Sequence, residues 1–123
     1  MNELEMLEWA AKAAGMRYIK PAEGYSGQLG LALCDEHGRP TRDWHPLHDD
    51  GDALRLAVRL QIGVSDRESC AEAVRSSRYG ESGLEVSIYC MEPFGDDPVA
   101  ATRRVIVRAA AEIGRAMGAD KCA

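Results

Sequence analysis

Two histidines and three aspartates within eight residues are the densest group of side chains in the chain that could bind a cation. His45 and His48 stand three residues apart, and Asp49, Asp50 and Asp52 follow at once. Imidazole nitrogens together with carboxylate oxygens could hold a divalent ion. The same aspartates are also the residue types that begin helices, so the pattern fits either a cation site or a helix start.

The neighbouring residues favour the structural interpretation. Pro46 forces a turn, Asp50 is a good N-cap, and Asp52 falls in a first helical turn, where the helix dipole favours negative charge. Trp44 is expected to anchor the turn in the core. We therefore predict no metal and no cofactor here.

We expect a helix from residue 49 or 50 to about 61. Its interior is apolar almost all round, which predicts burial between a sheet and another layer or against a partner subunit.

The last predicted helix carries a second group of charged side chains. Arg103, Arg104, Arg108 and Arg115 gather on its outer face, and Glu112 interrupts them. Such a face could contact nucleic acid or an acidic partner. An ordinary solvated face, with Arg108 paired to Glu112, is the simpler interpretation. These four arginines are the interaction face that the sequence singles out.

A third group of charged side chains consists of arginines that could bind a small ligand. Arg55, Arg59, Arg75 and Arg78 fall on the second predicted helix and on the strand that follows it. Guanidinium forks match phosphate geometry. The group therefore motivates a hypothesis in which a nucleotide signal binds between the sheet and the helices, for sequestration or for reaction.

Signatures of covalent catalysis are missing from the sequence. It contains no G-x-S-x-G, no P-loop and no G-x-G-x-x-G. Cys34 stands three residues before His37, but at a strand end and turn this proximity is more simply accidental. The cysteines Cys34, Cys70, Cys90 and Cys122 form no C-x-x-C pair and match no zinc spacing. We expect reduced thiols that serve as small core residues, and we predict no catalytic residue and no enzyme.

Length and composition indicate one globular domain over residues 1–123. A hydrophobic share of 46% and a charged share of 28% lie near globular averages and disfavour disorder. The net charge of −5 argues against binding to nucleic acid, because the phosphates would repel the acidic chain. No apolar run reaches the roughly 18–20 residues of a membrane span, and no secretory signal is recognised. We therefore expect no membrane association and a cytoplasmic location.

Helices are also predicted at both ends of the chain. The first spans residues 2–15, with Asn2 as its cap and Gly15 as its left-handed exit. The last begins at Pro98 after the cap Asp97 and leaves at Gly118. The expected buried stripe of the first helix is Leu4, Leu7, Ala11 and Ala14. That of the last helix is Val99, Thr102, Ile106, Ala110, Ile113 and Met117.

Four strands are predicted, over residues 16–20, 29–34, 67–78 and 84–91. The last is the clearest, since Leu84, Val86, Ile88 and Cys90 alternate with more polar residues. It should form an antiparallel hairpin with the strand before it. The fold class is then α+β in the order α-β-β-α-β-β-α, with a four-stranded antiparallel sheet and helices packed on it in two or three layers.

Three segments resemble small tailed-phage proteins grouped as the phage ABA sandwich domain, which overlaps with the NinX-like proteins. The segments read W-H-P-L at 44–47, D-A-L-R-L-A-V at 52–58 and D-P-V-A-A-T-R-R-V-I-V-R-A-A at 97–110. The resemblance implies a three-layer or partly covered α/β/α arrangement and a phage or prophage origin. It implies no reaction.

Three functional hypotheses follow. The first is a non-enzymatic phage accessory protein that binds a host or defence component, in the manner of anti-CRISPR inhibitors. The second is a protein or small enzyme that binds a small molecule or nucleotide signal. The third is a homodimeric interaction module whose second helix packs across a two-fold axis.

Overall fold

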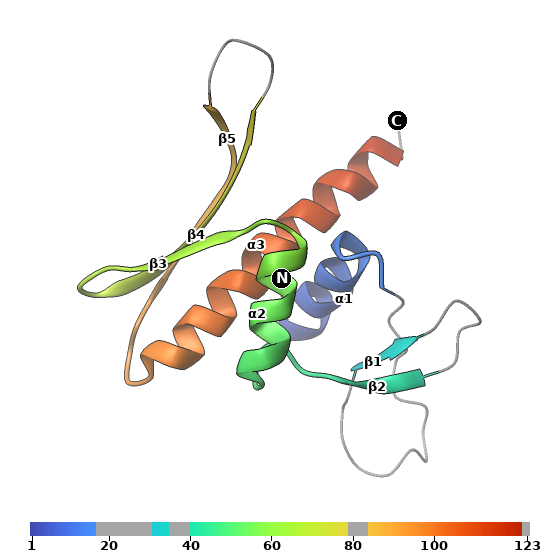
Figure 1. The fold of residues 1–123 in the computed structure, drawn as a ribbon, viewed down its shortest axis with the longest axis horizontal. Helices are drawn as coiled ribbons and strands as arrows, with labels where there is room; N and C mark the ends of the chain where they lie inside the picture. Colours follow the sequence, from blue (N-terminus) through green and yellow to red (C-terminus); the bar gives the residue numbers. More distant parts are fainter. Residues whose placement is uncertain (17–30, 35–39, 79–83, 122–123) are drawn as a thin grey trace.

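The computed structural model describes residues 1–16, 31–34, 40–78 and 84–121. Its elements, in chain order, are α1 (Glu3–Ala13), β1 (Leu31–Cys34), β2 (Pro40–Trp44), α2 (Asp50–Arg59), β3 (Gly63–Asp66), β4 (Cys70–Arg78), β5 (Leu84–Pro93) and α3 (Pro98–Lys121) (Figure 1). The predicted α+β class is confirmed.

The strands form two antiparallel sheets. β1 pairs with β2, and β3, β4 and β5 form a three-stranded sheet in that order. The β4–β5 hairpin was predicted, whereas β3 was missed because its four residues are all exposed and do not alternate. The described residues therefore do not form the single four-stranded sheet that the sequence predicted. Of the predicted strand 16–20, only residue 16 is described, and it is not in a strand.

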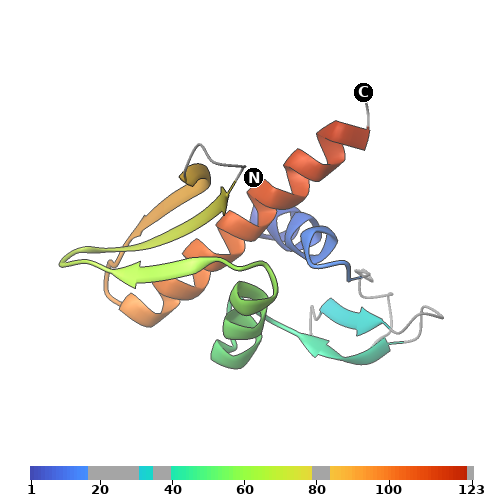
Figure 2. The same ribbon diagram turned by 45° about the horizontal axis from the view of Figure 1, so that its top comes forward.

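Helix α3 is the central element of the fold. It packs against β4 and β5 of the three-stranded sheet, and it also contacts α1 and α2 (Figures 1 and 2). Because it has neighbours on several sides, most of its middle section is buried, including Val105, Val107 and Ala110. The described helices cover one face of this sheet, while Tyr89 and Met91 on the other face are 55% and 51% exposed. Within the described residues, the order of layers is thus sheet, α3, then α1 and α2.

Glycines on α3 allow α1 to approach closely. A Cβ placed on Gly114 would overlap the backbone carbonyl of Trp9, and one on Gly118 would lie 2.8 Å from Cζ3 of the Trp9 ring. α3 continues through Gly118, where the sequence predicts its exit, and ends at Lys121. The glycine is a packing residue in the helix interior, a role that outweighs its low helix propensity.

The N-terminal helix has its predicted ends but a rotated buried face. The side chain of Asn2 accepts a hydrogen bond from the Glu5 backbone N–H (2.8 Å), and Gly15 has a φ of +72°. Leu4, predicted in the core, is 46% exposed. Ala11 and Ala14 are buried as predicted, and Met6 and Ala10, which the sequence did not assign to the core, are buried with them. Small residues face α3 because the helices approach so closely.

The predicted core of α3 is correct at its centre and wrong at its ends. Ile106, Ala110 and Ile113 are at most 5% exposed. Val99 and Met117 are 52% and 39% exposed, because they lie beyond the parts of α3 that its neighbours cover.

The described part of β5 alternates as predicted. Cys90 is buried, and Ile88 packs against the core, while Tyr89 and Met91 face outward. Burial raises the pKa of the Cys90 thiol. Cys70 and Cys90 are both free thiols.

Candidate binding groove between α2 and α3

An apolar groove of about 470 Å³ lies between α2, β3 and the first half of α3. We call it the α2–α3 groove. Its lining consists of Asp50, Ala53, Leu54, Ala57, Val58, Ile62, Val64, Asp66, Val99, Thr102, Arg103 and Ile106.

The groove is walled by one face of each of two helices. On α2 the lining positions are 50, 53, 54, 57 and 58, and on α3 they are 99, 102, 103 and 106. Both sets follow the i, i+3, i+4, i+7 spacing of a single helical face. Each helix therefore presents one row of side chains to whatever occupies the groove.

Large apolar side chains around this groove are exposed to solvent. Leu54 is 64% exposed, Val58 69%, Val99 52% and Val64 38%. The sequence predicts a largely buried α2, covered either by other layers of the fold or by a partner subunit, and no described element covers one of its faces. Ala53, Leu56 and Ala57 are indeed buried, but Leu54 and Val58 are not. Contiguous exposed apolar side chains on a small protein mark an interaction site more often than single ones do.

A Schellman turn connects α2 to the β3 side of the groove. Gln61 has a φ of +55°, and the Ile62 backbone N–H donates to the Ala57 carbonyl (2.8 Å). This hydrogen bond folds the chain back over the end of α2. Ile62 is thereby buried at the groove and Val64 is placed along its edge.

At the other end, Arg103 joins α3 to the start of α2. Its Nε donates to the Leu47 carbonyl (2.9 Å), and its Nη1 donates to Asp50 Oδ1 (2.6 Å). The Arg103 side chain is only 16% exposed, while that of Asp50 is 74% exposed. Arg103 thus sets the spacing of the two helices, and it neutralises Asp50.

The second acid of the groove has no such cation. Asp66 Oδ1 accepts from the Thr102 hydroxyl at 3.2 Å, but that hydroxyl also lies 2.8 Å from the Pro98 carbonyl. A hydroxyl has one proton, and the shorter contact is the stronger competitor for it. No cationic side chain within the described residues pairs with Asp66, whose charge therefore faces the groove and solvent.

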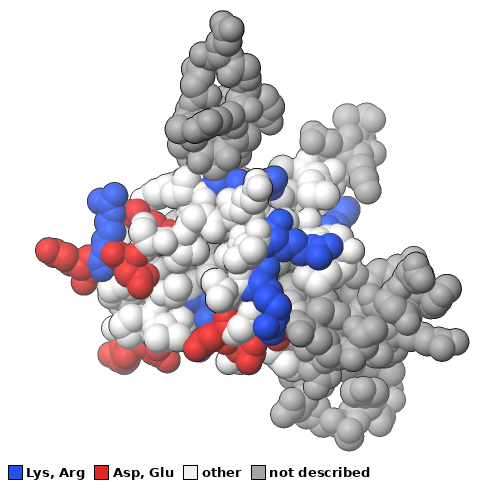
Figure 3. Space-filling view, viewed as in Figure 1, with Lys and Arg blue, Asp and Glu red and all other residues white. Residues whose placement is uncertain are grey.

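Acidic side chains continue around the start of α3. Asp96 and Asp97 are exposed and precede Val99 by three and two residues. Asp97 Oδ1 caps the helix by accepting from the Ala100 N–H (3.1 Å), as predicted. In Figure 3 red atoms flank the mainly white surface between α2 and the β3 side of the molecule. The α2–α3 groove is apolar in its interior and acidic at its rim.

The histidine–aspartate cluster of the sequence is occupied by structural contacts. Asp49, not Asp50, is the N-cap of α2, and its carboxylate accepts from the Asp52 N–H (2.8 Å). The chain leaves the turn one residue earlier than predicted, because the Asp49 N–H bonds back to the His45 carbonyl (2.7 Å).

Asp52 is buried at 6% exposure and ties the turn to α2. Its Oδ2 accepts from the His45 backbone N–H (2.9 Å), and its Oδ1 accepts from Arg55 Nη2 (2.8 Å). His48 is exposed. Within the described ranges, no three side chains of histidine, cysteine, aspartate or glutamate are grouped as a metal site would require.

The two histidines line a second hollow, of about 540 Å³, beside the first turns of α1. His45 Nε2 is buried there without a hydrogen-bond partner. Leu4 is the one large apolar residue in this lining that is more than a third exposed. The α2–α3 groove, with four such residues, is therefore the stronger candidate for a binding surface.

The four arginines predicted as an interaction face contact different residues of the chain itself. Arg103 binds α2, as described above. Arg108 Nη1 donates to Glu92 Oε1 (2.8 Å), and Arg104 Nε lies 3.6 Å from Glu92 Oε2. The hydrogen bond to Glu92 raises the pKa of the Arg108 guanidinium. These contacts fasten α3 to β5.

Arg115 lies 3.6 Å from Glu112 and is half exposed. The predicted pair of Arg108 with Glu112 is wrong, because Glu92 on the neighbouring strand reaches Arg108 first. Sequence spacing within one helix could not reveal that partner.

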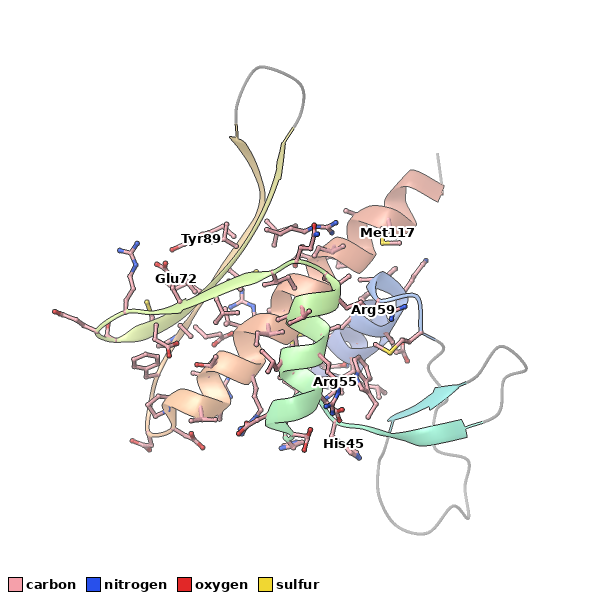
Figure 4. All side chains as sticks on the ribbon, in the orientation of Figure 1. His45, Arg55, Arg59, Glu72, Tyr89 and Met117 are labelled. Atoms are coloured by element: carbon pink, nitrogen blue, oxygen red, sulfur yellow. The ribbon has the colours of Figure 1, made fainter. Side chains whose placement is uncertain are left out.

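Two of the arginines proposed for a nucleotide site are held by contacts within the fold. Arg55 pairs with Asp52, and Arg59 Nε donates to the Ala14 carbonyl at the end of α1 (2.5 Å) (Figure 4). Arg75 lies on β4, and the side chain of Arg78 falls outside the described residues. Arg59 acts as a tie between α2 and α1.

The open face of the three-stranded sheet carries a contact that the sequence did not predict. The Tyr89 hydroxyl donates to Glu72 Oε1 (2.7 Å), and Arg67 Nε lies 3.0 Å from Glu72 Oε2 (Figure 4). The hydrogen bond to Glu72 raises the pKa of the Tyr89 phenol. The strand register places Glu72 and Tyr89 on the same face of the sheet. Glu72 pairs with Met91, Val74 pairs with Tyr89, and residues two apart on a strand share a face.

Comparison of the chain with protein-family models, curated proteins and solved structures finds no match. No helix in the described part of the chain is long and apolar enough to cross a membrane.

Proposed function

We propose that the chain is a non-enzymatic protein-binding module, and that its α2–α3 groove receives an apolar segment of a partner protein. The observation that carries this proposal is the exposure of Leu54, Val58, Val64 and Val99 around one groove. Their burial by a partner would remove apolar surface from water, which is the dominant favourable term in most protein associations.

We further propose a biological setting. The three segments that resemble phage ABA sandwich and NinX-like proteins favour a phage or prophage accessory protein acting in the cytoplasm of a bacterial host. The partner would then be a host or defence component, as for anti-CRISPR inhibitors. Two of these three segments also build the groove, since 52–58 and 97–110 contain Leu54, Val58 and Val99.

The test is comparative co-purification from phage-infected bacterial cells. Tagged wild-type protein is compared with the double variant Leu54→Gln/Val58→Gln and with the control Leu4→Gln, which alters an exposed leucine outside the groove. We expect a protein that is recovered with the wild type and the control but not with the double variant. Recovery of the same proteins with all three would contradict the proposal. Light scattering on each sample separates a homodimer from a complex with another protein.

A further inference from the structure

We infer that the segment received by the α2–α3 groove is an amphipathic helix with lysine or arginine residues beside its apolar face. This inference rests on the proposed function and specifies the chemistry of the partner.

The helical shape follows from the walls of the groove. Both α2 and α3 present rows of side chains at i, i+3, i+4 and i+7, and such rows pack best against the complementary ridges of another helix. Leu54 and Val58, one turn apart on α2, form one exposed ridge, and Val99 opens the facing row on α3. A third helix laid over them would bury its own row of apolar side chains between the two.

The charge of the partner follows from the rim. Asp50 already pairs with Arg103, but Asp66 has no cationic partner within the described residues, and its contact with the Thr102 hydroxyl is shared. Binding an apolar or acidic segment would desolvate or repel the Asp66 carboxylate, both of which cost free energy. A lysine or arginine at the edge of the helix would compensate that charge and would be attracted from a distance.

The same rim argues against a second copy of this chain as the occupant. A two-fold dimer brings identical surfaces together, so the acidic rim of one groove would face that of the other. The cationic side chain in the lining, Arg103, is already held by Asp50 and the Leu47 carbonyl. A basic helix from a different protein removes this repulsion.

A peptide library tests the inference directly. It consists of 18-residue helical peptides with a fixed leucine and valine face, in which the flanking positions are randomised among lysine, glutamine and glutamate. Peptides are selected on the wild-type protein and counter-selected on Leu54→Gln/Val58→Gln. The selected peptides are then titrated against Asp66→Asn and against the control Glu68→Gln, an exposed acid of the same hairpin that does not line the groove.

We expect enrichment of lysine at the flanks, helical circular dichroism in the bound peptide, and a loss of affinity of roughly two- to fivefold in Asp66→Asn but not in Glu68→Gln. Groove-dependent peptides that lack a lysine preference, or that bind in a non-helical form, would overturn this inference and leave the proposed function standing. A selection that yields no peptide discriminating the wild type from the double variant would overturn both.

Discussion

Gly114 of α3 lies directly against the backbone of Trp9 in α1, with no space for a side chain between them. This contact fixes how closely the two helices approach, and α3 in turn supports both the sheet and one wall of the α2–α3 groove. We therefore expect Gly114→Ala to destabilise the protein, although alanine is intrinsically the better helix former.

The expected loss for Gly114→Ala is roughly 2–3 kcal/mol of unfolding free energy, the upper part of the usual range for overpacking in a core, because the added Cβ would meet backbone atoms of Trp9. Urea denaturation followed by circular dichroism measures it. Ala116→Gly is the matched control, because residue 116 is exposed on the same helix and should cost about 1 kcal/mol from propensity alone. A Gly114→Ala variant as stable as the wild type would contradict the close approach of α1 and α3.

Gln61→Gly should stabilise the protein. Gln61 occupies the left-handed position of the Schellman turn after α2, with a φ of +55°, where a side chain is unfavourable and glycine is not. Part of the gain is offset by the greater freedom of glycine in the unfolded chain. We expect a net gain of about 1 kcal/mol, measured by the same denaturation experiment. Val58→Gly, at an ordinary helical position on α2, should lower stability instead, and a loss in both variants would contradict the assigned turn.

The contact between Tyr89 and Glu72 predicts a pH dependence of stability at alkaline pH. The hydrogen bond to Glu72 raises the pKa of the Tyr89 phenol above its usual value of about 10. The folded protein thus favours the protonated phenol. The resulting stability is fully present below the usual phenol pKa, and it is lost as the pH rises through the raised one.

The measurement compares unfolding free energies of the wild type and Tyr89→Phe between pH 8 and pH 11. We expect the wild type to be the more stable at pH 8 and the difference to shrink above pH 10. Any contribution from the Cys90 thiol, whose pKa is also raised, cancels in this comparison. A difference that stays constant to pH 11 would show that the phenol does not rely on Glu72.

Prediction from the sequence succeeded where short-range rules decide the outcome. The caps at Asn2 and Asp97, the left-handed Gly15 and the β4–β5 hairpin all depend on residues close together in the chain. The α+β class followed from the same local patterns.

Prediction from the sequence failed where contacts between residues far apart in the chain determine the structure. The apolar residues of α2 predict burial, either inside the fold or against a partner subunit, but no described element covers Leu54 and Val58. The local pattern predicts a helix end at Gly118, because the contact of this glycine with Trp9, more than 100 residues away, cannot be recognised from neighbouring residues. Arg108 was paired within its own helix, although its partner Glu92 lies on β5. The groove was missed for the same reason, since α2, β3 and α3 meet only in the folded chain.

Replacement of the groove side chains should leave folding intact. Leu54 and Val58 are 64% and 69% exposed, so Leu54→Gln/Val58→Gln should change the unfolding free energy by less than about 0.5 kcal/mol per site. Leu56, at 1% exposure on the same helix, is the contrast, and Leu56→Ala should cost about 2–5 kcal/mol. Equal losses at the two kinds of site would mean that Leu54 and Val58 serve the core rather than a partner.

The most direct test of the groove as a binding site is a fluorescence-anisotropy titration with the tightest groove-selected peptide, or with a partner recovered from infected cells. The wild type and Leu4→Gln are compared with Leu54→Gln/Val58→Gln. We predict the same Kd for the first two and a Kd weakened by roughly thirtyfold or more for the double variant, as expected when hot-spot side chains are removed. The same Kd for all three proteins would contradict the assignment of the α2–α3 groove as the binding site.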